Sequence, residues 1–513
     1  MYALSSTRNN GFILPILISV VLLSFFDKAQ AGNNYYFSSS IGDDSRTSLQ
    51  AQNPNTPWKS ITKLNAFFSS LAPGDSILFK RNEVFYGTIT PTVSGTLALP
   101  IVISAYGTGA KPVITGFTTI TGWTNEGGGI YSKVITAAST PNVVTVNGVN
   151  TPLGRYPNAG TANNGFLTID SFNGTTSIND AATPSTETNW TGAMMMVRFD
   201  HWLLNRCPVT NHSGTTITYS NLISYTPKAE GGFFFQNHIK TLDQFGEWCY
   251  VGGKLSMYFG SSNPDTYNVN ISTINRVVSV VSKNYITIHN LNLQGANFEA
   301  VYSTGSYIIV KNCNISFCGD NAITLSTNAN YNTVDNCDIM QIQNRGILGL
   351  ATNPTIKNCY IHAIAMLPGM GNSVNKGQTA IAIQGTGVNN SLIEYNRIDS
   401  VGYQGILFSG NNSIVRYNHV TNFNFNLDDG AGIYTGGNNF TGRKIFNNVV
   451  INNFGITASY GTNVTTVNSM GIYLDDNSTY VEVFNNTVAN TQYGIFLHGS
   501  HETEVYKNNI YNT

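Results

Sequence analysis

The sequence predicts an all-β protein: a right-handed parallel β-helix with an inserted β-rich, sandwich-like module. Three observations lead to this prediction. A short strand motif recurs at intervals of about 22 residues, a second strand motif follows it in each unit, and glycine and asparagine separate the two. Repetition of one short unit is typical of a solenoid, in which each coil packs on its neighbours.

The first motif is a triplet, most often Asn/Cys-x-Ile/Val. Successive triplets start 22, 24, 22, 37, 22, 30, 38 and 22 residues apart. A constant spacing with longer exceptions indicates regular coils, some of which carry inserted loops. The triplets begin at Leu291, Cys313, Cys337, Cys359, Asn396, Asn418, Asn448, Asn486 and Asn508.

The second motif is a short run with isoleucine at its centre. These runs are too short for helices, and their β-branched residues and flanking glycines favour strands. Stacked coils would place equivalent residues about 4.8 Å apart, with the isoleucines inside. The runs occupy residues 346–348, 380–382, 405–407, 432–434, 471–473 and 494–496.

Residues 1–31 have the pattern of a secretory signal peptide. Arg8 precedes an apolar run over residues 11–26, and Ala29-Gln30-Ala31 is a small-x-small cleavage site. The apolar run is short for a membrane anchor, which needs about 20 residues. We therefore expect cleavage after Ala31 and a secreted or cell-surface protein, with no membrane partner.

Residues 32–139 are expected to form the first coils of the β-helix, with a short helix near residues 57–68 as a cap. Strand-like runs there alternate with Gly and Pro. The 22-residue unit is absent from residues 140–275, although strand-like runs persist. Trp190, Trp202 and Trp248 also lie in this stretch. We interpret it as the inserted module.

The main β-helix is predicted for residues 276–513, where the regular spacing resumes. Its last triplet, at Asn508, lies next to the end of the chain. An uncapped coil exposes unpaired backbone groups, which proteins avoid. We therefore expect that the sequence is truncated and that further coils or domains follow.

Three of the six cysteines share one position of the triplet: Cys313, Cys337 and Cys359. Neighbours in such a stack lie within disulfide range, but their side chains point the same way. We expect a column of small buried residues instead. The sequence has no Cys-x-x-Cys pair beside them, so no metal site is predicted.

The charge of the chain is low. The formal net charge is -1, and charged residues make up 10% of the sequence. This composition does not suggest a nucleic-acid partner, because binding to phosphates requires many basic residues. Aromatic residues reach 12%, which argues against disorder.

The long insertions fall at one corner of the coil. The step from triplet to second motif is 9 residues in three coils, but 21 after Cys359, 14 after Asn418 and 23 after Asn448. Loops on neighbouring coils would form walls along one side of the solenoid, where functional sites are often built.

The strands beside these loops place two columns of side chains outward, because side chains alternate between the faces of a strand. One column is Ala382, Leu407, Tyr434, Tyr473 and Phe496, and the other is Gln384, Ser409, Gly436, Asp475 and His498. Aromatic rings beside an acid and an imidazole predict a sugar-binding groove, although aromatic residues also suit any sheet face. The predicted substrate-binding residues are Tyr434, Tyr473, Phe496 and Gln384.

Two Asp-Asp pairs lie on adjacent coils. Asp428 and Asp429 precede one second strand, and Asp475 and Asp476 end the next. Nearby carboxylates repel, so one holds its proton more firmly, as an acid and a base or nucleophile of glycosidic cleavage require. We predict Asp429 and Asp475 as the catalytic pair, with Asp428 and Asp476 in support. Aspartate is also a common turn residue and calcium ligand.

The catalytic prediction carries a geometric condition. Asp429 precedes its strand while Asp475 follows the equivalent one, so several extended residues of about 3.3 Å each separate them. The two carboxylates can act together only if residues 419–431 fold back across the groove. His498, one coil beyond Asp475, is expected to orient a carboxylate or to bind a sugar hydroxyl.

On these residues the chain resembles the glycoside hydrolase family 141 group of β-helix enzymes. The resemblance implies hydrolysis of plant-type polysaccharide, with fucosidase and xylanase activities known in the group. It indicates Asp429 with Asp475 or Asp476, and we choose Asp475 because it faces outward. The similar segments are residues 242–248, 254–258, 429–434 and 471–476.

Two other functions fit the same residues. A polysaccharide lyase of this fold would bind calcium with its acids and use a cation such as Arg443 or Lys444 as the base. A glycan-binding or adhesin-like solenoid would bind without releasing product. The spacing from Asp475 to His498 is also similar to that of polygalacturonases. The first hypothesis remains a secreted glycoside hydrolase with a polysaccharide substrate and no cofactor.

Overall fold

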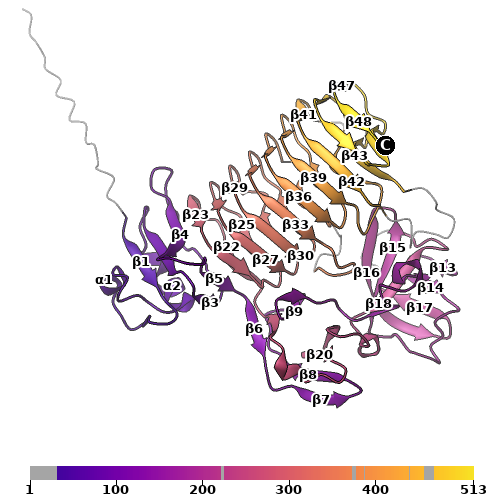
Figure 1. The fold of residues 1–513 in the computed structure, drawn as a ribbon, viewed down its shortest axis with the longest axis horizontal. Coiled ribbons are helices and arrows are strands. Elements are labelled where there is room, and N and C mark those ends of the chain that lie inside the picture. The colour runs from indigo at the N-terminus through magenta and orange to yellow at the C-terminus, as the bar shows by residue number, and fades with distance from the viewer. Residues whose placement is uncertain (1–31, 221–224, 372–376, 386, 438–439, 456–466) are drawn as a thin grey trace, which may run out of the picture. The chain divides into compact units, whose positions relative to one another are not determined.

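The computed structural model describes residues 32–220, 225–371, 377–385, 387–437, 440–455 and 467–513. The predicted signal peptide lies outside the described residues. Three long parallel sheets run through the solenoid, and each regular coil contributes one strand to each of them (Figure 1). We name them sheets A, B and C in the order in which a coil enters them.

The strands of these sheets are short and follow one another in chain order. Sheet A contains β1 (Asn34–Phe37), β2 (Ser76–Lys80), β4 (Ile101–Tyr106), β23 (Ile286–His289), β26 (Ile309–Lys311), β29 (Thr333–Asp335), β32 (Thr355–Lys357), β35 (Leu392–Glu394), β38 (Ile414–Arg416), β41 (Arg443–Phe446), β44 (Val481–Phe484) and β47 (Glu504–Tyr506). Sheet B contains β3 (Val84–Tyr86), β5 (Val113–Thr115), β24 (Asn292–Gln294), β27 (Asn314–Cys318), β30 (Asp338–Ile342), β33 (Tyr360–Ile364), β36 (Arg397–Val401), β39 (His419–Phe423), β42 (Val449–Asn453), β45 (Thr487–Ala489) and β48 (Asn509–Tyr511). Sheet C contains β22 (Arg276–Val280), β25 (Glu299–Ser303), β28 (Asn321–Leu325), β31 (Arg345–Gly349), β34 (Ile381–Ile383), β37 (Ile406–Phe408), β40 (Gly430–Gly436), β43 (Ser469–Asp475) and β46 (Tyr493–Leu497).

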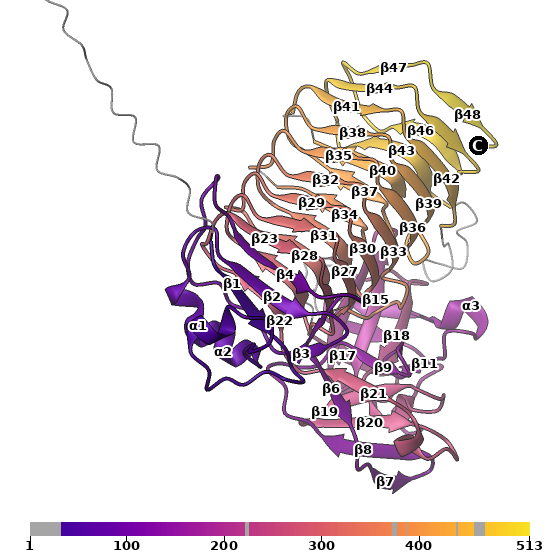
Figure 2. The same cartoon turned by 60° about the vertical axis from the view of Figure 1, so that its left-hand side comes forward.

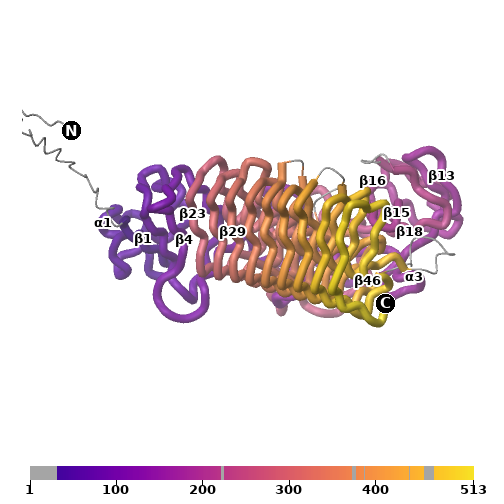
Figure 3. Tube along the Cα trace, turned by 90° about the horizontal axis from the view of Figure 1, so that it is seen from above, coloured from indigo at the N-terminus to yellow at the C-terminus, as the bar shows by residue number. Residues whose placement is uncertain are grey.

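The predicted right-handed parallel β-helix is confirmed by this arrangement. Strands of sheet C pair in parallel from β22 to β46, and the coils succeed one another regularly (Figures 2 and 3). The second motif forms sheet C, and its isoleucines stack inside the solenoid. Ile381, Ile406, Ile433 and Ile472 are each fully buried. Burial of this apolar column stabilises each coil against its neighbours.

The triplet position forms a second internal column. Asn418 Nδ2 donates to the carbonyl oxygens of Ile393 and Arg416, and its backbone N–H donates to Asn448 Oδ1 at 2.9 Å. Asn448 bonds to Asn486 in the same way. The side-chain amides thereby satisfy buried backbone groups at the turn between sheets A and B. All six cysteines are free and buried.

The described α-helices are few and short: α1 (Ser48–Ala51), α2 (Ile61–Phe67) and α3 (Ala162–Gly165). The predicted helix near residues 57–68 is α2, which begins after Ser60, whose side chain accepts a hydrogen bond from the backbone N–H of Lys63. Ile61 and Leu64 of α2 pack into the core of the first coils. Within the described ranges no helix combines the length and apolar character needed to cross a membrane.

The strands between Phe117 and Ser272 belong to three other sheets, which are antiparallel in the pairs that the structure describes. Thus β6 and β8, expected among the first coils, pair instead with strands beyond residue 140, and β7 pairs with β8. The first sheet holds β10 (Val149–Asn150), β9 (Val144–Val146), β21 (Val269–Ser272) and β6 (Phe117–Ile120). The second holds β11 (Arg155–Tyr156), β12 (Leu167–Thr168), β18 (Gly232–Gln236), β15 (Met194–Asp200), β16 (Leu203–Ser213), β17 (Thr216–Tyr219), β14 (Ser177–Asn179) and β13 (Ser171–Asn173). The third holds β19 (Trp248–Val251), β20 (Lys254–Tyr258), β8 (Ile130–Val134) and β7 (Thr124–Gly127).

Candidate active site

The outward face of sheet C carries the two predicted columns in register. Tyr434 of β40 lies opposite Tyr473 of β43, which lies opposite Phe496 of β46. In the second column, Asp475 follows Gly436, its partner on β40. The next coil brings His498 to Asp475, with Nδ1 of the ring 2.7 Å from Oδ1 of the carboxylate.

Three groups hold the carboxylate of Asp475. The hydroxyl of Tyr434 donates to Oδ2 at 2.8 Å, while His498 Nδ1 and the backbone N–H of Asp476, at 2.8 Å, both approach Oδ1. The hydrogen bond between His498 and Asp475, together with the charge of Asp475, raises the pKa of His498. Charge-assisted hydrogen bonds of this kind fix the orientation of a carboxylate.

Asp429 reaches the same place from the other end of its strand. Its backbone has a φ of 56°, in the left-handed region, and this turns the chain just before β40 begins. The backbone N–H of Asp429 donates to the Asn468 carbonyl, and its own carbonyl accepts the Tyr403 hydroxyl at 2.6 Å. The carboxyl groups of Asp429 and Asp475 consequently line one cavity of about 460 Å³. Residues 419–423 form β39 and β40 begins at Gly430, so only the turn between these strands, and not the whole of residues 419–431, brings Asp429 to this cavity.

The two carboxyl groups differ in environment. Burial raises the pKa of Asp429 to about 6, and the negative charge of Asp475 adds to this increase. The charge of His201 acts in the opposite direction and lowers the pKa of Asp429. Burial, and after it the charges of the same two carboxylates, raise the pKa of the Tyr473 hydroxyl, which lies beside them. A carboxyl group that keeps its proton up to nearly neutral pH can act as a general acid.

Asp428 does not line the cavity, contrary to what a direct supporting role would require. Its side chain is fully buried and binds Arg198 at the end of β15, with Nη2 2.6 Å from Oδ1. His201 Nδ1 lies 2.8 Å from Oδ2. The carbonyl of His201 also accepts the backbone N–H of Asp428. These contacts join the hairpin β15–β16 to the turn that carries Asp429.

The same sheet supplies a wall of the site. Trp202, in the turn between β15 and β16, and Tyr225, between β17 and β18 in the chain, line the cavity with the two catalytic candidates, and their rings are 6.5 Å apart. We call this space the acidic cavity; Tyr403, Tyr434, Tyr473, Asp476 and His498 complete its lining. A second space of about 290 Å³, the adjoining cavity, shares Trp202, Tyr225, Tyr403 and Tyr434 with it. Together the two form a groove between sheet C and the hairpin.

The remaining predicted residues occupy different parts of this groove. Gln384 lines the adjoining cavity. Asp476 lines the acidic cavity, where burial and the charge of Asp475 raise the pKa of its carboxyl. Phe496 is not among the described lining residues, because its ring packs on Tyr473 with centroids 5.2 Å apart. Phe496 therefore contacts the site through Tyr473, its neighbour on the preceding coil.

The proposed lyase bases lie elsewhere. Arg443 is fully buried and donates to Thr435 Oγ1 and to the carbonyls of Gly436 and Gly437, which makes it a structural residue. Lys444 pairs with Glu482 at 2.8 Å on sheet A. Neither residue lines the acidic cavity. Among the described side chains, no three His, Cys, Asp or Glu residues are grouped as a metal site requires.

Sequence reasoning missed Arg198, His201, Trp202, Tyr225 and Tyr403. The first four come from outside the repeat, so no periodic pattern connects them with sheet C. Arg198 offers one usable sign, because it stands in the apolar run of β15, where a charge needs a partner. Tyr403 precedes its strand and falls outside both outward columns.

Known proteins share this architecture. The family model "Right handed beta helix region" matches residues 257–380. A solved structure titled "Glycoside hydrolase" has a TM-score of 0.77 at 15% identity and covers 93% of this chain and 97% of its own. The complex of XylC with xylose has a TM-score of 0.50 at 14% identity, over 92% of this chain and 70% of its own. These similarities show the fold.

One curated protein matches over a short stretch. Over 89 residues, 16% of this chain, the sequence is 44% identical to the lacto-N-biosidase of Bifidobacterium longum subsp. longum. The chain covers 5% of the length of that relative.

Proposed function

We propose that the protein is a glycoside hydrolase that cleaves a plant-type polysaccharide, with Asp429 as general acid and Asp475 as base or nucleophile. One observation carries the proposal: the carboxyl groups of Asp429 and Asp475 line a single cavity but have different surroundings. The pKa of Asp429, near 6, keeps part of its population protonated at mildly acidic pH. Asp475 is held by hydrogen bonds from Tyr434 and Asp476.

The reaction follows from these positions. Asp429 donates its proton to the glycosidic oxygen as the bond to the anomeric carbon breaks. Asp475 then either accepts a proton from the attacking water or forms a covalent glycosyl ester that water hydrolyses. Both routes add one water. In the covalent route Asp429 regains its proton from the hydrolysing water and both groups return to their starting states, whereas in the direct route Asp475 ends protonated and Asp429 ionised, and proton exchange with solvent resets the pair. Tyr434 and Tyr473 offer apolar ring surfaces and hydroxyls to the sugar, as binding clefts commonly do.

The comparisons support the class of reaction. A structure with the same fold along nearly the whole chain is titled a glycoside hydrolase, and XylC binds xylose. The name of the curated relative describes a glycosidase. A hydrolase is favoured over a lyase because no lysine or arginine is among the described residues that line the acidic cavity. Secretion, proposed from residues 1–31, would give the enzyme access to polysaccharide.

The test is to express the chain from Gly32, screen plant polysaccharides for reducing-sugar release, and repeat the positive assay with variants. Asp475→Asn and Asp429→Asn should each lower kcat at least 1000-fold, because each removes one half of the acid and base pair. Ser409→Ala, in the same outward column but outside the acidic cavity, should stay active. Full activity of Asp475→Asn would refute the assignment.

Two outcomes would indicate the other functions. Release of an unsaturated product that absorbs ultraviolet light and requires calcium would indicate a lyase. Binding of glycans with no product from any substrate would indicate a binding solenoid.

A further inference from the structure

The adjoining cavity differs from the acidic cavity in charge. Arg345, the first residue of β31, lines it, and none of its described lining residues is an aspartate or glutamate. Thr379, Gln384 and Gln404 contribute polar side chains, while Trp202 and Tyr225 form the opposite wall. The groove thus has a carboxylate-rich end and a cationic end.

The guanidinium of Arg345 has an unmet bonding capacity. Its Nε is buried and has no hydrogen-bond partner within the described ranges. The group lies directly against the backbone of Gly377, where any added Cβ would overlap it. Burial lowers the pKa of Arg345, and the charge of Asp320 offsets only part of this effect. Asp320 itself accepts a hydrogen bond from Asn344.

Gln404, in the same cavity, has a side-chain oxygen that lacks a hydrogen-bond donor within the described ranges. The residue is 3% exposed, and its Oε1 has no hydrogen-bond partner among the described residues. Buried polar atoms are nearly always bonded, so an exception calls for a missing partner. Arg345 needs an acceptor and Gln404 Oε1 needs a donor. A sugar with both a carboxylate and free hydroxyls supplies the two together.

We propose that the adjoining cavity is a subsite for an acidic sugar, whose carboxylate binds Arg345 and whose hydroxyl donates to Gln404. The inference rests on the proposed function, because it assumes that a polysaccharide chain occupies the groove. The planar guanidinium matches the two oxygens of a carboxylate and forms stronger hydrogen bonds with it than with a neutral hydroxyl.

The subsite would also set the direction of the chain. β31 and β43 are four strands apart in sheet C, which is about 19 Å at the usual strand spacing. The acidic sugar therefore lies several sugar units from the cleavage point. Asp429 and Asp475 repel a carboxylate at their end of the groove, while Arg345 attracts one at the other.

Isothermal titration tests this subsite. The probes are oligosaccharides of glucuronoxylan and of polygalacturonate, each compared with its carboxyl-reduced form. The protein is the chain from Gly32 with Asp475→Asn to prevent turnover. At least one acidic probe should bind about tenfold more tightly than its reduced form, since hydrogen bonds to charged groups are the stronger ones. That preference should weaken as salt is added.

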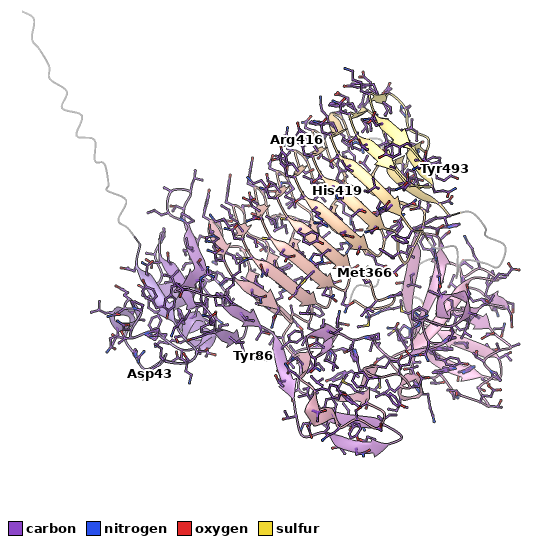
Figure 4. The ribbon with its side chains drawn as sticks, in the orientation of Figure 1. Asp43, Tyr86, Met366, Arg416, His419 and Tyr493 are labelled. Atoms are coloured by element: carbon purple, nitrogen blue, oxygen red, sulfur yellow. The ribbon has the colours of Figure 1, made fainter. Side chains whose placement is uncertain are left out.

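Variants then locate the effect. Arg345→Met should abolish the preference, and Arg345→Lys, which keeps the charge but loses the planar fork, should retain part of it. Arg416→Met is the matched control, because Arg416 pairs with Glu394 on sheet A, away from the groove (Figure 4). Gln404→Met should weaken both forms of the sugar equally. Circular dichroism and thermal melting verify that each variant is folded.

The outcomes separate this inference from the proposed function. Equal binding of acidic and reduced forms, or binding of neither, overturns the subsite even if the wild-type enzyme releases product. A preference that depends on Arg345, with no product from any substrate, supports the subsite and refutes the hydrolase.

Discussion

Asp428 and Asp429 are neighbours in the chain, yet their carboxyl groups lie in different surroundings. Asp428 is fully buried against Arg198 and His201, whereas Asp429 opens into the acidic cavity. A buried ion pair adds little net stability, but loss of one partner leaves an uncompensated charge. We infer that Arg198 positions the turn and thereby Asp429, the proposed general acid.

Arg198→Met should lower the free energy of unfolding by about 3–5 kcal/mol, because it leaves the carboxylate of Asp428 buried with a weaker set of partners. Urea denaturation measures the loss. Asp428→Asn in the same background should recover part of it, since the amide carries no charge. Lys444→Met breaks the exposed pair with Glu482 and should cost less than about 1 kcal/mol. A loss for Arg198→Met as small as this control would contradict the positioning role.

The proposed acid also predicts a pH profile. Activity should fall as the pH rises through about 6, because Asp429 loses the proton that it donates. The charge of His201 lowers the pKa of Asp429, so His201→Asn should move this limb to higher pH. His362→Asn, at the Asp338 pair on sheet B, should leave the profile unchanged. Profiles of kcat/KM against pH give the apparent pKa of this limb in the wild type and in each variant. An unchanged limb in His201→Asn would contradict the assignment of Asp429 as the acid.

At the scale of the elements, most of the solenoid could be predicted from the sequence. The triplets and isoleucine runs are the strands of sheets B and C, because each residue stacks on the equivalent residue of the next coil. The same reasoning placed His498 beside Asp475, which the structure also shows. Its assignment of Phe496 to substrate binding stays a prediction, because that ring packs on Tyr473 and is not among the described residues that line the acidic cavity.

The internal column of stacked asparagines at the triplet position, which we call the asparagine column, should be a principal stabiliser of the coils. Asn448 is 1% exposed; its Nδ2 donates to Val415, Phe446 and Asn486, and its Oδ1 accepts from Asn418. Asn448→Ala should cost about 2–4 kcal/mol, because it leaves the buried backbone N–H of Asn418 unpaired. Thermal and urea unfolding measure this cost.

The exposed Asn509 in β48 provides the comparison. Asn509→Ala removes an asparagine of similar sequence context without breaking the internal column, so its cost should stay within about 0.5 kcal/mol. Equal effects of the two substitutions would show that the side-chain amides of the column are not needed to stabilise the coils.

At the scale of the whole molecule, the groove depends on contacts that no local pattern predicts. Arg198 and Asp428 are 230 residues apart in the chain. The strands between Phe117 and Ser272 follow no repeat, so their position against sheet C cannot be derived by stacking one unit on the next. The sequence could therefore place the acids on one face of the solenoid but could not supply the opposing wall.

That wall should act in binding rather than in chemistry. Trp202 is 38% exposed and lines both cavities, but it contacts neither proposed catalytic carboxyl group in any described hydrogen bond. Trp202→Ala should raise KM on a polymeric substrate about tenfold through loss of ring contacts, with kcat changed less than twofold. Steady-state kinetics separate the two parameters.

Phe172 provides a matched control for this last prediction. It is an aromatic residue of β13 with 40% exposure, in the same sheet as the hairpin, and it lines neither cavity. Phe172→Ala should leave both kinetic parameters unchanged. If Trp202→Ala also left KM unchanged, the inserted strands would not bind substrate, and sheet C alone would form the site. If it lowered kcat instead, the hairpin would act on the transition state, because only interactions made there change the rate of the chemical step.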